Sequence, residues 1–355
     1  MEASSRLAWL PDVAVALALV ALPLVLTPYT HDLVLKIAIY AVFALSLELL
    51  VGMTGLVSLG HAAFLGIGAY ATVLVSAHDG VSLAGVLGAA VGAAAAYALF
   101  VGALSLRTRG VYFIMVTLAF AQMAYFVFHD TKLGGGSDGI FLGAKPALAV
   151  GGQPWIDLAD KHHLYYAVLA ALAGTYALLA LVRRSRFGHA LAGIRASEQR
   201  MRAVGYRTLL YKLAAFVVAG ALAGLAGFLL AVKDGAVNPE LLGWRESGAV
   251  LLMVILGGIG HLRGAVIGAA AFTLLTELFQ SEAIIGSLAV HWQMTLGFTI
   301  IGFVALMPRG LMGGRPQMDR RRAPPPRAIP IDATMEWQST MHQPRSERSM
   351  DPHDA

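Results

Sequence analysis

The sequence predicts an all-α polytopic integral membrane protein with about ten transmembrane helices. Hydrophobic residues make up 57% of its 355 residues and charged residues only 13%, with a mean hydropathy of +0.69. A soluble domain normally carries about 25% charged residues. The apolar residues also gather in stretches that are about long enough, as helices, to cross a hydrocarbon core of about 30 Å. Both observations exclude an ordinary soluble domain.

The apolar stretches define the expected helices in order. They cover residues 9–28, 33–51, 58–77, 81–105, 110–128, 164–182, 211–232, 247–260, 264–280 and 290–307. The first ends at Pro28 without a small-residue cleavage motif, so we expect a retained helix instead of a signal peptide. Residues 1–310 are therefore predicted to form one transmembrane domain. The basic, proline-rich and then polar tail, residues 311–355, is typical of disorder, and Arg320 to Arg322 would stop transfer or contact lipid head groups.

The distribution of positive charge predicts the orientation, because Lys and Arg accumulate in cytoplasmic loops. With ten spans and an inside N-terminus, the inner segments hold 18 Lys and Arg residues and the outer loops hold five. Both termini are then cytoplasmic, residues 129–163 form the longest outer loop, and residues 183–212 form the longest inner loop. The chain has no cysteine, so its redox compartment is not indicated. Its pI near 9.5 comes mainly from these loops and does not imply nucleic acid binding.

The string "GHAAFLGIGAY", residues 60–70, superficially resembles a dinucleotide-binding loop through Gly66 and Gly68. That loop would need a preceding strand, a third glycine and an acidic residue about 20 positions later. Here an apolar run precedes the string, and Ala71 replaces the third glycine. The chain has no Gly-Lys pair and therefore no P-loop. The small residues instead predict a face where membrane helices pack closely.

His61 follows the string "TGLVSLG", where the helical pattern breaks. It would either hydrogen-bond a backbone carbonyl or line a translocation pathway, since polar groups at membrane depth face protein or a cavity. The pathway candidates are Glu48, Ser58, Gly60, His61, Gly66 and Gly68. Residues 260–269, "GHLRGAVIGA", share five positions with residues 60–69 and suggest a possible internal repeat.

The inner loop at residues 183–212 carries a helical pattern. Leu191, Ile194, Met201 and Val204 recur near helical spacing, which predicts one short amphipathic helix ended by Gly205. Such a loop is either a basic connector on anionic lipid or a docking element for a cytoplasmic partner.

The spans contain no convincing catalytic cluster, and the adjacent His162 and His163 lack the spacing of a helical metal site. We therefore assign no catalytic residue and no metal ligand. An ion-coupled transporter that uses Glu48 or Glu277 as its coupling acid stays an alternative, and an integral membrane enzyme is a weaker one. On the outer side, "GGGSDG", residues 134–139, is either a flexible turn or a contact for substrate or a binding protein.

Several strings, in order, resemble the permease subunits of branched-chain amino acid ABC importers, the LivH/LivM family, and most closely the LivM type. They are "LELLVGMTGLVSLGHAAFLGIGAYA" (47–71), "TRGVYFIMVTLAFAQM" (108–123), "GGSDGI" (135–140), "RFGHALAGIRASEQRMRAVGYRTLLYKLAAFVVAGALAGLAG" (186–227) and "LGGIGHLRGAVIGAA" (256–270). The resemblance runs from about residue 33 to residue 310.

This resemblance implies a fold similar to type II importers such as the vitamin B12 transporter, in the cell inner membrane. It implies a homologous second permease, two cytoplasmic ATPases that use ATP, and a periplasmic solute-binding protein, with no cofactor on this chain. The coupling helix would lie in residues 183–212, with candidates Arg195, Glu198, Arg202, Ala203 and Gly205. Glu48 departs from the neutral Asn frequent in the family; it would snorkel to the inner interface or titrate in the pathway. Close relatives of such permeases carry urea, amides or other small solutes, so these stay alternative substrates.

Overall fold

The computed structural model describes residues 27–78, 82–143, 145–150, 153–281, 286–307 and 310–312. Contacts divide the chain into Met1–Gly314 and Arg315–Ala355, and the second unit lies outside the described residues. Nearly all of the predicted first span, 9–28, and of the predicted tail, 311–355, also lie outside them. Leu311 and Met312 are described, and their N–H groups bond the carbonyls of Leu256 and Gly257.

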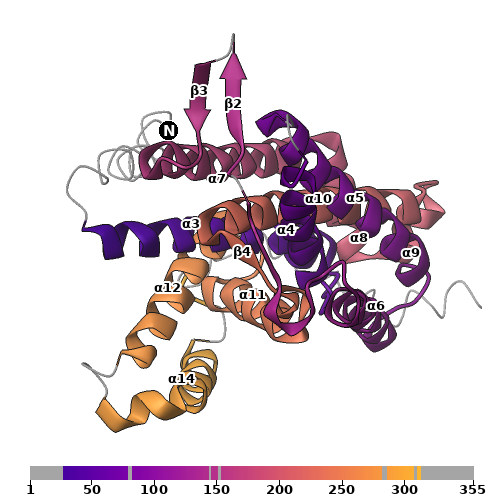
Figure 1. Ribbon diagram of the computed structural model, residues 1–355. Helices are drawn as coiled ribbons and strands as arrows, with labels where there is room; N and C mark the ends of the chain where they lie inside the picture. The colour runs from indigo at the N-terminus through magenta and orange to yellow at the C-terminus, as the bar shows by residue number, and fades with distance from the viewer. Residues whose placement is uncertain are drawn as a thin grey trace, which may run out of the picture. The chain divides into compact units, whose positions relative to one another are not determined.

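The described chain is mainly helical (Figure 1). The longer helices are α3 (Pro28–Glu48, continued by the π-helix Leu49–Thr54), α4 (Ala62–Ser76), α5 (Leu83–Ser105), α6 (Val111–Asp130), α7 (Lys161–Arg184), α8 (Arg186–Ala196), α10 (Thr208–Asp234), α11 (Trp244–Gly257), α12 (Leu262–Gln280) and α14 (Trp292–Leu306). Shorter elements are α9 (Glu198–Ala203) and the 3-10 helices Gly136–Asp138, Pro239–Leu242 and Gly286–His291. Two small antiparallel sheets pair β1 (Ile140–Phe141) with β4 (Ala236–Val237) and β2 (Ala147–Val150) with β3 (Gln153–Asp157).

Six of the described helices are long and apolar enough to cross a membrane, so the predicted count of about ten is not confirmed. They are Pro28–Thr54, Leu83–Ser105, Val111–Asp130, Lys161–Arg184, Thr208–Asp234 and Leu262–Gln280. The predicted spans 58–77, 247–260 and 290–307 correspond to α4, α11 and α14, which have 15, 14 and 15 residues. At 1.5 Å per residue each is shorter than a hydrocarbon core of about 30 Å. Hydropathy detected the apolar segments but not how much of each is helical.

Small residues form the centre of the bundle, where α10 packs on α4 and α5. Cβ atoms built at Gly220 and Gly224 of α10 would lie 2.4 Å from the Cβ atoms of Ala98 and Ala94 on α5. A Cβ at Gly227 would lie 2.0 Å from the Leu65 carbonyl oxygen of α4. Backbones this close gain van der Waals contact without a hydrophobic driving force, as membrane helices require.

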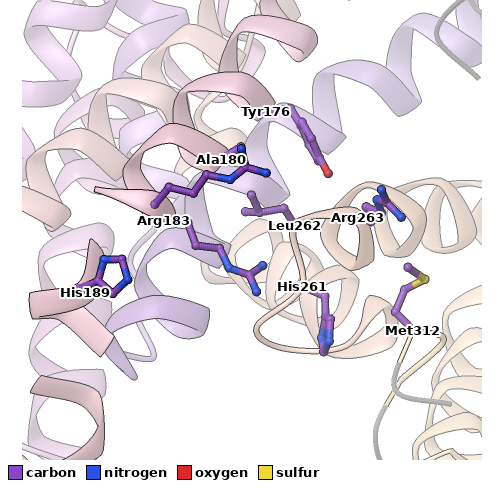
Figure 2. A pocket seen from close by; sticks show the side chains of 9 residues that line it. Tyr176, Ala180, Arg183, His189, His261, Leu262, Arg263 and Met312 are labelled. Atoms are coloured by element: carbon purple, nitrogen blue, oxygen red, sulfur yellow. The ribbon is translucent and has the colours of Figure 1, made fainter. Parts of the chain in front are cut away.

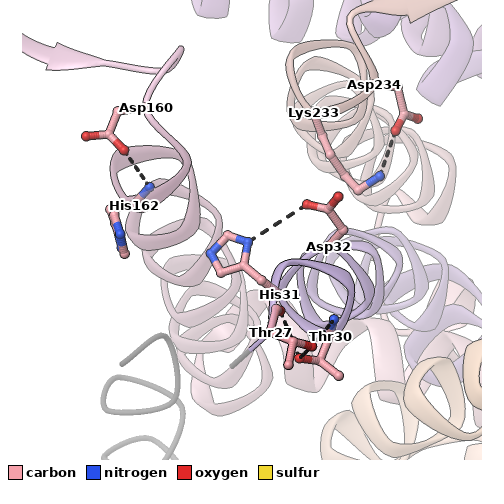
Figure 3. A network of polar contacts seen from close by, with 8 residues as sticks. All are labelled: Thr27, Thr30, His31, Asp32, Asp160, His162, Lys233 and Asp234. Carbon is pink, nitrogen blue, oxygen red and sulfur yellow. Dashed lines mark hydrogen bonds and ion pairs between the residues drawn. The ribbon is translucent and has the colours of Figure 1, made fainter. Parts of the chain in front are cut away.

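One end of the bundle is rich in arginine. There α5 and α7 end and α10 and α12 begin, with Arg107, Arg183, Arg184, Arg195 and Arg263 among the side chains. We call this the arginine-rich end. At the opposite end, α3 begins beside the start of α7, and the His31 ring lies 6.4 Å from that of His162 (Figure 3). The same ring lies 5.2 Å from that of Tyr165.

Candidate functional site

The first candidate site is the break between α3 and α4. Residues 55–61 have no regular helix, and Ser58, Gly60 and His61 are buried there. The Ser58 hydroxyl accepts a 3.2 Å hydrogen bond from the Gly60 N–H. A Cβ atom at Gly60 would lie 2.1 Å from the Thr117 carbonyl oxygen on α6. Gly60 therefore lets the irregular segment lie directly on α6, and protein covers its backbone as membrane depth requires.

His61 is fully buried at this break. Its Nε2 lies 2.8 Å from the Ser46 hydroxyl, and its ring stacks on Phe43 with centroids 5.5 Å apart. The ring of Phe64 meets its edge at 5.5 Å. The predicted backbone-carbonyl partner is therefore wrong: the side-chain partner is a serine hydroxyl inside α3.

The hydrogen bonds of Ser46 indicate the tautomer of His61. A hydroxyl has one proton, and Ser46 Oγ also lies 2.6 Å from the Phe43 carbonyl oxygen. If Ser46 donates to that carbonyl, His61 must donate from Nε2, which leaves Nδ1 as a bare acceptor. Nδ1 has no hydrogen-bond partner within the described parts of the chain. The site thus contains one buried polar atom without a partner.

The N-termini of α4 and α11 meet at this level. The Ala62 N–H donates a 3.0 Å hydrogen bond to the Ser247 hydroxyl. From there α4 runs along α10 toward the opposite end, and α11 runs to Gly257 at the arginine-rich end. The Tyr40 hydroxyl, near the middle of the α3 span, lies 3.4 Å from the Glu246 carboxylate. Two half-length helices of opposite direction therefore bring their positive N-terminal ends together near mid-depth.

Gly66 and Gly68, the remaining glycine candidates, lie farther along α4 and make close contacts. A Cβ at Gly66 would lie 2.4 Å from Leu242 Cγ, and one at Gly68 would lie 2.5 Å from the Gly224 carbonyl oxygen. These are the contacts of a packing face, as the small-residue pattern predicts.

Glu48 lies at the last turn of α3 and is 1% exposed. Its Oε1 accepts a 2.6 Å hydrogen bond from the Gly260 N–H, while Oε2 has no partner among the residues described. Gly52 leaves room for the carboxylate, since a Cβ there would lie 1.9 Å from Oε1. The snorkelling alternative is therefore wrong, because the side chain is held inside the protein.

Arg195 connects this cluster to the basic loop. Its guanidinium donates to the Gly52 carbonyl from α8, which packs on the π-helix. Glu48, Gly52, Arg195 and Gly260 thus join α3, α8 and the turn between α11 and α12.

The loop at residues 183–212 forms two helices instead of the single amphipathic helix predicted. Ser197 is extended, with φ −165° and ψ 101°, and separates α8 from α9. Its hydroxyl caps α9 by accepting a 3.4 Å hydrogen bond from Arg200 N–H. Leu191 and Ile194 are buried as expected, but Val204 is 75% exposed. Periodicity missed the serine cap, which restarts the helix on another axis.

Glu198 holds α9 against the start of α10. Its carboxylate lies 2.5 Å from Arg202 Nη2 and 2.6 Å from Lys212 Nζ, and it accepts a 3.1 Å hydrogen bond from Thr208. Partial burial alone would raise the pKa of Glu198. The hydrogen bond and positive charge of Lys212, the hydrogen bond from Thr208 and the positive charge of Arg202 act in the opposite direction. Together they outweigh burial and lower the pKa of Glu198 below its ordinary value. Of the coupling candidates, Arg195, Glu198 and Arg202 therefore make contacts within the chain.

Ala203 and Gly205, the other two coupling candidates, are exposed. Gly205 has φ +92°, as expected for a glycine that ends a helix, and nothing lies within 4 Å of a Cβ built there. Exposed apolar side chains surround it: Val204 at 75%, Tyr206 at 41% and Leu210 at 53%. These residues form an exposed, partly apolar patch at the arginine-rich end.

Sequence reasoning missed three hydrogen-bond partners and one exposed pair of residues. The missed partners are Ser46 for His61, Ser247 for Ala62, and Gly260 for Glu48. No local pattern in the sequence encodes these contacts. Trp244, 60% exposed, and the exposed Arg245 form the first turn of α11 near mid-depth. The charge distribution counts Arg245 among the five outer-loop charges, and α11 instead places it near mid-depth. An arginine at membrane depth marks a protein contact or an aqueous cavity.

A bundle of apolar helices with two half-length helices meeting inside it, and a basic two-helix loop at one end, is typical of a transport permease. The profile of the family described as branched-chain amino acid transport system / permease component matches residues 29–305. The chain belongs to this family, which confirms the resemblance inferred from its strings.

Relatives from two bacteria show the same likeness. The high-affinity branched-chain amino acid transport system permease protein LivM of Escherichia coli (strain K12) is 30% identical over 327 residues, covering 86% of this chain and 75% of the relative. LivM of Salmonella typhimurium is 29% identical over 326 residues, covering 84% and 74%. LivH of Escherichia coli (strain K12) is 25% identical over 297 residues, covering 79% and 93%. No solved structure matches the chain.

Proposed function

We propose that the chain is the transmembrane permease subunit of an ATP-driven importer that carries branched-chain amino acids across the inner membrane. It works with a homologous second permease, two cytoplasmic ATPases and a periplasmic solute-binding protein. It binds no cofactor of its own, and the ATPases use the ATP.

The family match over residues 29–305 carries this proposal, because relatives of both the LivM and the LivH type fall within it. Likeness to both types also supports a partnership of two homologous permeases. The absence of a Gly-Lys pair, and hence of a P-loop, supports ATP hydrolysis on separate subunits.

The loop at residues 183–212 supports coupling to an ATPase. Its exposed surface at Val204, Gly205 and Tyr206 receives the ATPase, and the network of Glu198, Arg202 and Lys212 makes the loop rigid. Arg195 passes movement of α8 to the Gly52 carbonyl, beside Glu48. ATPase closure would thereby shift α3 and the start of α12 together and bias access between the two sides.

The meeting of α4 and α11 supports a substrate pathway near His61, Ser58 and Gly60. Half-helix N-termini and irregular backbone near mid-depth are features that transporters use to bind substrates. Trp244 and Arg245 add an exposed aromatic ring and a cation at the same level.

Reconstitution tests the proposal. The permease pair is placed in vesicles with binding protein and ATP, with and without the two ATPases. Concentrative leucine uptake should require the ATPases. Equal uptake without them would instead favour ion coupling. For ion coupling Glu277 is poorly placed, because its carboxylate accepts a hydrogen bond from Tyr29 at the start of α3, away from the break at His61.

The orientation has its own test, because the chain has no cysteine and single ones can be introduced. Ser137→Cys and Ala203→Cys alter exposed positions at opposite ends of the bundle. An impermeant thiol reagent should label only Ser137→Cys in intact cells if both termini are cytoplasmic. Labelling of Ala203→Cys from outside would show that the proposed orientation is wrong.

Substrate identity rests on the names of the relatives. Affinity profiling of the cognate binding protein against leucine, isoleucine, valine, urea and short amides would separate the alternatives. Preference for urea or an amide would keep the permease class and replace the substrate.

A further inference from the structure

A cavity of about 620 Å³ opens at the arginine-rich end between α7, α8 and α12 (Figure 2). Its lining residues are Tyr176, Ala180, Arg183, Arg184, His189, His261, Leu262, Arg263 and Met312. It is separate from the break at His61, from the Glu198 network and from the exposed surface at Gly205.

Among the residues that the structure describes, the lining is basic, with three arginines and two histidines and no acidic residue. Figure 2 shows Arg183, His261 and Arg263 around the same opening. Like charges held together repel, so the cluster favours a bound anion. The start of α12 at Leu262 adds the positive end of a helix. Glu48 does not line the cavity, but its carboxylate attracts Arg183 from inside the protein. One carboxylate does not balance three arginines, so the cavity stays basic.

An apolar surface continues from this basic opening. Ala180 and Tyr176 extend the cavity along α7 into its apolar span. On α12, Ile267, Leu274 and Leu278 are 41%, 49% and 39% exposed and follow Arg263 at helical spacing. Both α7 and α12 pack on α3. A water-soluble anion would use only the basic opening, whereas a phospholipid would use both surfaces.

We propose that this cavity binds the phosphate head group of an anionic phospholipid, whose acyl chains lie along α7 and α12. Arg183, Arg184 and Arg263 provide the cations, as in other basic pockets between membrane helices that hold lipid head groups. A lipid in this place ties the start of the loop at residues 183–212 to the start of α12. With the proposed orientation the lipid lies in the inner leaflet, and only this leaflet assignment rests on the proposed function.

The test measures the thermal stability of the purified full-length chain in neutral detergent, without ATPases or substrate. It therefore gives its answer even if the proposed transport function is wrong. Phosphatidylglycerol, phosphatidylcholine and inorganic phosphate are titrated separately. We expect phosphatidylglycerol to raise the melting temperature and the other two to have little effect. Equal stabilisation by inorganic phosphate would show a free-anion site, and equal stabilisation by phosphatidylcholine would show no head-group selectivity; either result overturns the proposal.

Variants locate the effect in the cavity. Arg183→Gln/Arg184→Gln, and Arg184→Gln alone in case the pair folds poorly, should weaken phosphatidylglycerol binding, by about tenfold or more for the pair. Arg186→Gln is the matched control: an exposed neighbour with the same change in charge that does not line the cavity. Equal weakening in the control, or unchanged binding in the folded cavity variants, would refute the site. Loss of ATPase retention together with unchanged lipid binding would assign these arginines to a protein partner instead.

Discussion

The Glu48 carboxylate accepts a 2.6 Å hydrogen bond from the backbone N–H of Gly260, 212 positions away in the chain. The carboxylate is buried and the Gly260 N–H is partly buried, and the bond joins the end of α3 to the turn between α11 and α12. Glu48 in turn depends on Gly52, whose missing side chain makes room for the carboxylate.

This arrangement predicts coupled stability effects. Glu48→Ala removes the side-chain acceptor of the partly buried Gly260 N–H and should cost about 1 kcal/mol. Gly52→Ala places a methyl group on the carboxylate and should cost a similar amount by displacing it. The double variant should cost less than the sum, since both changes remove the same contact. Thermal melting of the four proteins measures the cycle. Gly88→Ala is the control, because a Cβ there meets nothing within 4 Å; strict additivity would contradict the interpretation.

His61 allows its structural role to be separated from a role in transport. Ser46→Ala removes the one hydrogen-bond partner that the buried His61 imidazole has among the described residues, and should lower stability by about 1 to 3 kcal/mol. Adding His61→Phe removes the unpaired group and should recover part of that loss, since the ring can stack on Phe43. If His61 belongs to the pathway, the recovered double variant should still transport poorly. Normal uptake by that variant would remove His61 from the pathway.

Gly205 predicts a defect confined to coupling. Gly205→Val forces a branched residue to φ +92°, at a cost of about 1 to 2 kcal/mol, and adds bulk to an exposed surface. Expression should stay near normal, while ATPase retention and substrate-stimulated hydrolysis fall. Gly235→Val is the matched control, with φ +68° and the same open surroundings beyond the far end of α10. Equal losses in both variants would indicate general strain instead of docking.

The Glu198 network predicts a pH dependence. The pKa of Glu198 is lowered in the folded protein. The stabilisation that its carboxylate contributes is therefore complete above the unfolded pKa of about 4.3, and is lost as pH falls through the lower pKa of the folded state. Hydrogen exchange in residues 198–204 should be faster in Glu198→Gln than in wild type at neutral pH. The difference should shrink below about pH 4.3. Glu240→Gln, at an exposed carboxylate elsewhere, should leave this segment unchanged; a difference that grows toward acid pH would disprove the sign.

Local signals predicted much of the candidate site. The glycine string at residues 60–70 predicted close packing, and Gly205 predicted the helix end, because both depend on backbone geometry near the residue itself. Val204 was placed wrongly, since the cap at Ser197 redirects α9 and turns Val204 outward. The pairs Ser46–His61, Ser247–Ala62 and Glu48–Gly260 could not be predicted, because each depends on how separate helices meet.

The sequence by itself determined the membrane class and the family, since apolar composition, charge distribution and ordered strings are properties of the chain alone. Only the tertiary structure decided that α4 and α11 are half-length helices joined through Ala62 and Ser247. It also decided that Glu48 points inward to Gly260, and that Arg183, Arg184 and Arg263 share one cavity. Hydropathy records the average environment of a segment. Where a helix starts and which polar groups meet depend on backbone hydrogen bonds and packing between segments that are distant in the chain.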